Sequence, residues 1–158
     1  MLGGLARWLR LLGHDTAYDP TAGDRELLAR AAVEQRILLT RDTRIVPPAG
    51  VRLALVRALG TEGQLREAAA RFDLAWTADA FTRCIRCNVP LLPASAADVE
   101  EKVPDYVRAT QEVFCACPCC GRVYWPGTHR TAMEKTLRRL LPDRGRRTGT
   151  GQPAAPGA

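Results

Sequence analysis

The chain has 158 residues, and 46% of them are hydrophobic, which is sufficient for the core of one ordinary domain with a small added module. No apolar run is long enough to cross a membrane and no secretory signal precedes the cysteines, so the sequence argues against a membrane or secreted protein and favours a cytoplasmic one. The formal net charge of +6 favours an anionic partner. The basic excess is concentrated at the end, where residues 138–158 hold five arginines and one aspartate.

Leucines at helical spacing predict a first helix over residues 2–12. Gly13 follows directly and suits the left-handed conformation that ends many helices. Arg7 and Arg10 lie off the leucine stripe, so we expect both side chains to face solvent.

The next segment contains a candidate strand around residues 16–18 and then a helix over residues 24–35. Asp24 stands at the start of that helix, where an aspartate is a favoured N-cap, and the leucines and alanine that follow supply the buried side. The Asp24 carboxylate therefore has an ordinary structural interpretation, which must be weighed against any catalytic one.

Two largely apolar runs, residues 37–40 and 51–56, are typical of strands that are covered on both faces. A Thr-Glu-Gly-Gln capping box then predicts a helix over residues 61–72. Because strands and helices alternate through this region, we predict an α/β unit with parallel strands, which we place at residues 1–78.

All six cysteines lie between positions 84 and 120, and two pairs of them are separated by two residues. These pairs are Cys84 with Cys87 and Cys117 with Cys120. Two such pairs can close a tetrahedral shell of four thiolates around a zinc ion. A disulfide framework and plain buried thiols are the alternatives, and the lack of a secretory signal makes zinc the better interpretation.

The residues after each pair support the same choice of zinc ligands. Asn88 follows the first pair and Gly121 the second, and both residue types tolerate the positive φ that turns backbone amides toward the sulfurs. Cys115 and Cys119 have no partner at this spacing, so we leave them outside the ligand set. A zinc site closed by four cysteines is structural rather than catalytic.

The second unit, residues 79–141, must hold structure of its own between the cysteine pairs, since 29 residues separate Cys87 from Cys117. That spacer exceeds the usual length in a zinc ribbon. We expect it to contain a helix over residues 97–114 that Pro104 interrupts.

After the second pair we expect a strand over residues 122–125 and a final helix, opened by a second capping box, over residues 131–141. Tyr124 and Trp125 could stack on an unpaired base, but packing of the small ribbon is the interpretation that we favour. The tail, residues 142–158, is rich in Gly, Pro, Ala, Thr and Arg, so we predict a disordered basic segment.

Acidic side chains stand at the carboxyl end of the predicted parallel sheet, where open α/β sheets bind ligands. Asp42 follows the first of the two apolar runs, Asp24 begins the preceding helix, and we expect Asp19 nearby. Such carboxylates can hold Mg²⁺ or Mn²⁺, which activate water for attack on a phosphodiester. The plainer interpretations are a helix cap for Asp24 and a turn residue for Asp42.

Several segments of the chain resemble, in the right order, the signature of one known family. They are residues 2–13, 18–19, 24–28, 37–42, 81–88 and 117–129. Together they resemble the Mut-seven C-terminal RNase domain family, in which a PIN-like nuclease domain is fused to a zinc ribbon. The combination runs from Met1 to about Leu141 and is specific, whereas each segment alone would be weak.

The resemblance implies a three-layer PIN-like α/β fold with a parallel sheet, followed by a four-cysteine zinc ribbon. It also implies metal-dependent cleavage of RNA, with Asp24 and Asp42 as catalytic carboxylates that bind Mg²⁺ or Mn²⁺, and with the four paired cysteines as structural zinc ligands. Family members usually begin with a strand that ends in an aspartate just before this first helix. Met1 stands where that strand ends, so we expect the natural start to lie upstream.

The prediction as a whole is a ribonuclease that hydrolyses RNA through a carboxylate-bound divalent ion. We expect RNA as the partner, Arg7, Arg41 and Arg122 as residues that bind it, and no membrane. The alternatives are a zinc-ribbon protein that binds nucleic acid without cleaving it, and a ribbon that docks on a protein.

Overall fold

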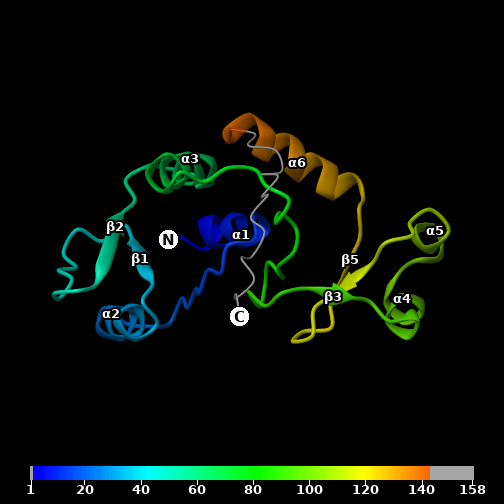
Figure 1. The fold of residues 1–158 in the computed structure, drawn as a ribbon, viewed down its shortest axis with the longest axis horizontal. Coiled ribbons are helices and arrows are strands. Elements are labelled where there is room, and N and C mark those ends of the chain that lie inside the picture. The colour runs from blue at the N-terminus through cyan, green and yellow to red at the C-terminus, as the bar shows by residue number, and fades with distance from the viewer. Residues whose placement is uncertain (1, 143–158) are drawn as a thin grey trace, which may run out of the picture.

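The computed structural model describes residues 2–142, which form two small sheets joined by helices (Figure 1). The N-terminal α/β part and the sheet that follows the first cysteine pair lie in opposite halves of the view, and the last helix runs along one side between them. Within the described residues, no helix has the length and apolar character that a membrane span needs.

The first sheet consists of two parallel strands, β1 (Ile37–Thr40) and β2 (Arg52–Leu55). The pairing continues past β2, because the Val56 amide donates to the Thr40 carbonyl at 2.7 Å. The predicted α/β unit with parallel strands is therefore confirmed. Among the described residues this sheet has only two strands, and the three-layer PIN-like arrangement remains a prediction.

Helix α1 (Gly3–Leu11) matches the first predicted helix and contributes Leu5, Leu9 and Leu11 to the main hydrophobic core. It packs against α3 (Thr61–Phe72), and the two helices share the core with Val56, which directly follows β2. The fully buried leucines of this core include Leu5, Leu12 and Leu65. Burial of these side chains is the main driving force that holds α1 in place.

The end of α1 depends on Gly13, which has a φ of +92°. Its amide donates to the Arg10 carbonyl and the His14 amide donates to the Leu9 carbonyl, which satisfies carbonyls of the last helical turn. A Cβ at position 13 would lie 2.5 Å from the Asp79 carbonyl oxygen. Backbone conformation and space both require glycine at this position.

Gly13→Ala is expected to lower the free energy of unfolding by about 3 kcal/mol or more, because the strain at positive φ and the clash with Asp79 add. Gly50→Ala is the matched control, since Gly50 has a φ of +85° but nothing lies within 4 Å of its Cβ position. We expect a loss of about 1 kcal/mol for the control. Urea unfolding measures both losses, and equal values would contradict the close contact at Gly13.

Helix α2 (Asp24–Val33) precedes β1 and packs against it, with Ala31 as its one fully buried residue. The N-cap position of α2 is Gly23, and Asp24 is the first helical residue without a capping hydrogen bond, so the predicted cap is wrong. The capping box predicted for α3 is wrong for a similar reason. Gly60, with a φ of +71°, takes its N-cap position, and no side chain caps the helix.

The predicted strand around residues 16–18 does not form, and residues 14–19 have no regular secondary structure. Thr16 uses its backbone groups to bond side chains instead of a neighbouring strand. Its amide donates to Asn88 Oδ1 at 2.9 Å, and its carbonyl accepts from Arg10 Nε at 2.8 Å. A partner 72 positions away decides this conformation, and a short-range pattern does not reveal it.

The second sheet is antiparallel and consists of β3 (Leu92–Pro93), β4 (Cys115–Ala116) and β5 (Val123–Tyr124). The helix predicted between the cysteine pairs is present in two pieces, α4 (Ala96–Lys102) and α5 (Asp105–Arg108), as the proline break requires. A separate small core joins these helices to the sheet. Its buried members are Val103, Val107 and Val123.

Helix α6 (Thr128–Leu140) begins before the predicted capping box at Thr131, because Gly127 supplies the N-cap. The capping box is therefore wrong, although the helix itself was predicted. Leu137 and Leu140 of α6 are buried in the same core as α1 and α3. The last helix of the described residues therefore packs against helices from the first half of the chain.

The predicted division into residues 1–78 and 79–141 remains a prediction. The two segments share a core through α6, since its leucines pack with those of α1 and its Arg139 pairs with Glu62 of α3 at 2.8 Å. The predicted disordered tail lies outside the described residues from position 143 onward.

Candidate functional site

Four cysteine sulfurs converge, as the spacing of the two pairs predicts. The Sγ atoms of Cys84, Cys87, Cys117 and Cys120 all lie within 4.8 Å of one another, and those of Cys84 and Cys120 are 3.9 Å apart. Sulfurs in a tetrahedral zinc shell are about 3.8 Å apart, so this arrangement is close to the spacing that a bound ion requires. The donor set fits zinc, and the predicted cluster of four cysteines is confirmed.

The two cysteine turns share one backbone pattern, which directs amides at the sulfurs. In the first turn, the Asn88 amide donates to the Cys84 carbonyl at 2.9 Å, and the Cys87 amide donates to Cys84 Sγ at 3.3 Å. In the second turn, Gly121 and Cys120 make the equivalent bonds at 2.9 and 3.4 Å. Asn88 and Gly121 have φ values of +68° and +66°, as the sequence predicts.

Hydrogen bonds to Cys84 favour its thiolate form. Burial raises the pKa of this thiol, but the Tyr124 hydroxyl, 3.2 Å from the sulfur, and backbone amides outweigh burial and lower the pKa to about 6. The hydrogen bond with Cys120 raises the pKa of Cys87, because adjacent thiols do not ionise independently. A bound divalent cation would allow the neighbouring thiols to be ionised together, since a coordinated thiol is deprotonated.

The remaining cysteines lie outside the cluster, as predicted. Cys115 is half-buried in β4, and Cys119 is exposed within the second turn. Among residues 2–142, the four-cysteine cluster is the only convergent group of three or more His, Cys, Asp or Glu side chains. The metal centre for which the structure offers a full donor set is therefore the one made of cysteines.

Tyr124 and Trp125 follow the second turn and serve the ribbon itself. The Trp125 ring packs against Phe114, with 6.4 Å between the ring centroids, and belongs to the small core. The Tyr124 hydroxyl is hydrogen-bonded with Cys84 Sγ. These contacts agree with the packing interpretation of the aromatic residues rather than with base stacking.

Arg10 contacts the first cysteine turn, and its burial contradicts the prediction that it faces solvent. Only 7% of its surface is exposed. Nη1 donates to the carbonyls of Ile85 and Arg86, the two residues between the cysteines, at 3.1 and 2.8 Å. Burial lowers the pKa of Arg10, and bonds of this kind, worth about 1.5–3 kcal/mol each, offset the cost of burying its charge. Arg10 lies one helical turn after Ala6, which is also buried. The two residues share a buried side of α1 that the leucine spacing does not indicate.

Asp42 follows β1 at its carboxyl end, where the sequence predicts it. Its Oδ1 accepts from the Arg44 amide at 2.8 Å, so Asp42 is also the turn residue of the plainer interpretation. The Arg44 guanidinium bonds the two carboxylate oxygens at 3.1 and 2.7 Å, and these bonds lower the pKa of Asp42 to about 2. Asp42 is therefore ionised at neutral pH, beside an arginine that is itself 86% exposed.

Asp24 and Asp42 both affect the pKa of the Arg44 guanidinium. Bonds with Asp42 raise the pKa of Arg44, and the charge of Asp24 adds to this effect. Asp19 does not form a convergent group with them, and its Oδ1 accepts from the amide and the hydroxyl of Thr21. The expected cluster of three acids is absent from residues 2–142, while the roles of Asp24 and Asp42 as metal ligands remain a prediction.

The three arginines predicted to bind RNA are exposed but lie on separate elements. Arg7 is on α1, Arg41 directly follows β1, and Arg122 directly precedes β5. Figure 1 places β1 and β5 in opposite halves of the molecule. A single RNA strand would have to extend across the molecule to reach both Arg41 and Arg122.

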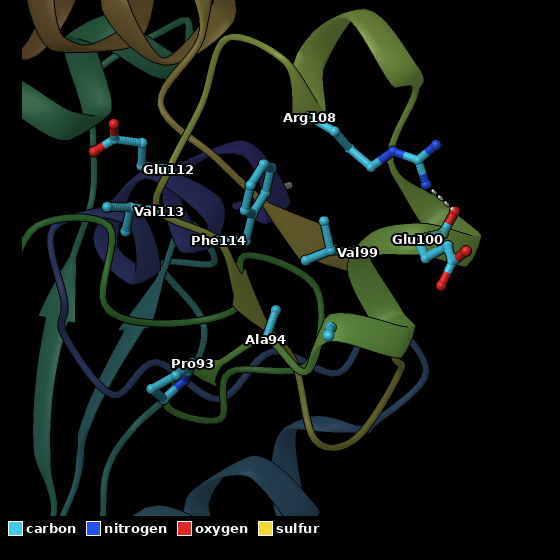
Figure 2. A pocket seen from close by; sticks show the side chains of 9 residues that line it. Pro93, Ala94, Val99, Glu100, Arg108, Glu112, Val113 and Phe114 are labelled. Atoms are coloured by element: carbon cyan, nitrogen blue, oxygen red, sulfur yellow. Dashed lines mark hydrogen bonds between the residues drawn. The ribbon is translucent and has the colours of Figure 1, made fainter.

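A hollow of about 680 Å³ lies on the ribbon, between α4 and the segment that follows α5 (Figure 2). Val99 and Phe114 give it an apolar lining, and Glu100 and Glu112 stand at its margins. The Arg108 side chain points toward the Glu100 backbone oxygen, to which it donates at 2.7 Å. Two carboxylates disfavour RNA phosphates, so we leave this hollow out of the candidate RNA site.

Comparison with known proteins identifies one family. The family model of the Mut7-C RNAse domain matches residues 1–137. Searches of curated proteins and of solved structures give no match. The matched segment contains both the strand that leads to Asp42 and the four clustered cysteines, in agreement with the resemblance seen in the sequence. The chain belongs to the Mut7-C RNase domain family.

Proposed function

We propose that the chain is a ribonuclease that hydrolyses phosphodiester bonds of RNA through a divalent ion held by Asp24 and Asp42. The observation that carries the proposal is the family match, which includes Asp42 at the carboxyl end of a parallel strand. Ligands of open parallel sheets bind at this edge. The ionised state of Asp42 at neutral pH also suits a metal ligand.

The chemistry of the two carboxylates suits Mg²⁺ or Mn²⁺, because hard cations prefer oxygen donors. A bound ion would supply activation of water and stabilise charge on the phosphodiester. Two carboxylates leave most of about six coordination positions to water and RNA oxygens. Arg44 already places a positive charge against Asp42, and its exposed side chain costs little to displace.

The basic side chains supply the attraction for RNA in this proposal. Arg41 is exposed and adjacent to Asp42 in the chain, so it can bind a phosphate next to the acids. Arg7 and Arg122 would extend the contact beyond this point, and the net charge of +6 favours a polyanion. The cysteine cluster has a structural role, since a closed four-cysteine shell leaves no position open for substrate.

A second candidate function is nucleic-acid binding without cleavage. Two observations favour it: Asp42 is already paired with Arg44, and residues 2–142 contain no convergent group of three carboxylates. In this case zinc would hold the ribbon, and the arginines would bind RNA without chemistry at the acids.

Incubation of the zinc-loaded chain with RNA, with Mn²⁺ or Mg²⁺ and with neither, tests the proposal. We expect cleavage only with the divalent ion. RNA binding with a steep salt dependence, without cleavage in the presence of either ion, would select the second candidate.

A further inference from the structure

Arg10 joins two parts of the chain that are far apart in sequence. It comes from α1, and its Nε donates to the Thr16 carbonyl at 2.8 Å, just after that helix. Its Nη1 donates to the carbonyls of Ile85 and Arg86, 75 and 76 positions away. These carbonyls belong to the turn between two metal-binding cysteines, so one guanidinium fixes both α1 and the first cysteine turn.

Other polar contacts surround the same turn. Asn88, whose positive φ closes the turn, accepts from the Thr16 amide at 2.9 Å and donates to Asp15 Oδ1 at 2.6 Å. Arg83 directly precedes the first cysteine, and its Nε donates to the Gly13 carbonyl at 3.3 Å. Residues 13–16 therefore contact the chain before and after the first cysteine pair.

The contacts continue to β1 through a weaker link. Arg36, the residue before β1, pairs with Asp15 at 3.0 Å. The side chains of Asp15 and Arg36 are 48% and 33% exposed, so water screens this pair. Arg10, by contrast, is buried, so water screens its bonds to the cysteine turn less than it screens the pair of Asp15 and Arg36.

We propose that Arg10 is a positioning residue of the metal centre, which couples zinc binding to the packing of α1. Its Nη1 holds the two carbonyls between Cys84 and Cys87 while its Nε bonds the Thr16 carbonyl, and so the guanidinium orients the turn that presents both sulfurs to the ion. Four thiolates around one divalent ion carry a net negative charge, which a buried guanidinium nearby compensates. This inference concerns the metal centre alone and is independent of the proposed ribonuclease reaction.

Coupling of this kind acts in both directions. If Arg10 strengthens zinc binding, bound zinc must stabilise the packing of α1 by the same factor. Zinc would then stabilise the N-terminal core as well as the ribbon whose sheet follows the first cysteine pair. The second turn, by comparison, is held within the ribbon by the pairing of β4 with β5.

Arg10→Met tests the proposal, with Arg7→Met on the same helix as the matched control, because Arg7 is exposed. Competition with a chromophoric chelator measures the zinc affinity of the full chain. We expect about a 10- to 100-fold loss of affinity for Arg10→Met and less than about a twofold change for Arg7→Met. Arg10→Lys retains the charge but not the fork, so its affinity should fall between those of the wild type and Arg10→Met.

Arg10→Lys decides the matter if Arg10→Met does not fold with zinc present. Unchanged zinc affinity in Arg10→Lys would then overturn the proposal, as would equal losses in Arg10→Met and Arg7→Met. Hydrogen exchange gives an independent measurement: removal of zinc from the wild type should expose amides of α1 as well as those of the ribbon. Loss of protection confined to residues 84–125 would contradict the coupling.

Discussion

Cys84→Ser is expected to abolish stoichiometric zinc binding and to lower the free energy of unfolding by about 4 kcal/mol or more. Cys84 is fully buried at the centre of the cluster, where its sulfur accepts from the Cys87 amide and bonds the Tyr124 hydroxyl. A serine oxygen is a poor substitute for a thiolate on zinc, and the buried core beside the cluster is small, with only Val103, Val107 and Val123 as its buried members. Metal analysis and urea unfolding measure the two effects.

Cys115→Ser is the control for this experiment, because Cys115 is half-buried, lies on β4 and is outside the cluster. It should retain one zinc ion per chain and lose little stability. Loss of zinc in both variants would overturn the assignment of ligands. Retention of zinc in both would show that the metal is held by other residues.

Asp42→Asn is expected to reduce metal-dependent RNA cleavage by about 100-fold or more, because an amide binds a divalent cation far less well than a carboxylate does. The substitution should leave the fold intact. The Arg44 partner is 86% exposed, and surface pairs of this type contribute little to stability. A loss of cleavage would therefore report on chemistry rather than on unfolding.

Asp105→Asn is the matched control for Asp42→Asn. Like Asp42, Asp105 pairs with an arginine close in sequence, Arg108, but it lies on α5 of the ribbon and is more exposed than the half-buried Asp42. This variant should cleave RNA as the wild type does. Comparable losses in both variants would indicate a general effect of charge on RNA binding and would contradict a specific role for Asp42.

The cluster of four cysteines was predictable because each turn follows a local pattern. Two residues separate the cysteines of each pair, and Asn88 or Gly121 follows at positive φ. Asp42 at the end of β1 was predictable for the same reason. Arg44, which pairs with the Asp42 carboxylate, is only two positions away in the sequence. The sequence therefore shows that this pair is possible, but it does not show that the pair forms.

The role of Arg10 was not predictable from periodicity. A leucine stripe shows which side of α1 meets the main core. The cysteine turn covers a second side of the helix, where it contributes the carbonyls of Ile85 and Arg86, while the Ile85 side chain packs against the main core. The same long-range contacts explain why residues 14–19 are irregular where a strand was expected. Contacts 70 or more positions apart are outside the reach of short patterns.

Helix starts show a further limit of sequence patterns. Helices α2, α3 and α6 were expected to begin with Asp or Thr caps, yet each begins directly after a glycine: Gly23, Gly60 and Gly127. Only Gly60 has a positive φ that favours glycine, whereas Gly23 and Gly127 have an extended backbone that other residues also adopt. In all three cases the predicted polar cap lies within the helix instead of at the N-cap position. The helices themselves were correct because their apolar spacing is a stronger signal than the cap.

Cleavage of a labelled RNA by the zinc-loaded chain, measured as the Mn²⁺ concentration is raised, tests the central claim most directly. The account predicts that cleavage appears and saturates with Mn²⁺, is lost in Asp42→Asn and persists in Asp105→Asn. Cleavage that does not depend on Mn²⁺, or that Asp42→Asn retains in full, would contradict the assignment of the reaction to an ion held at the end of β1.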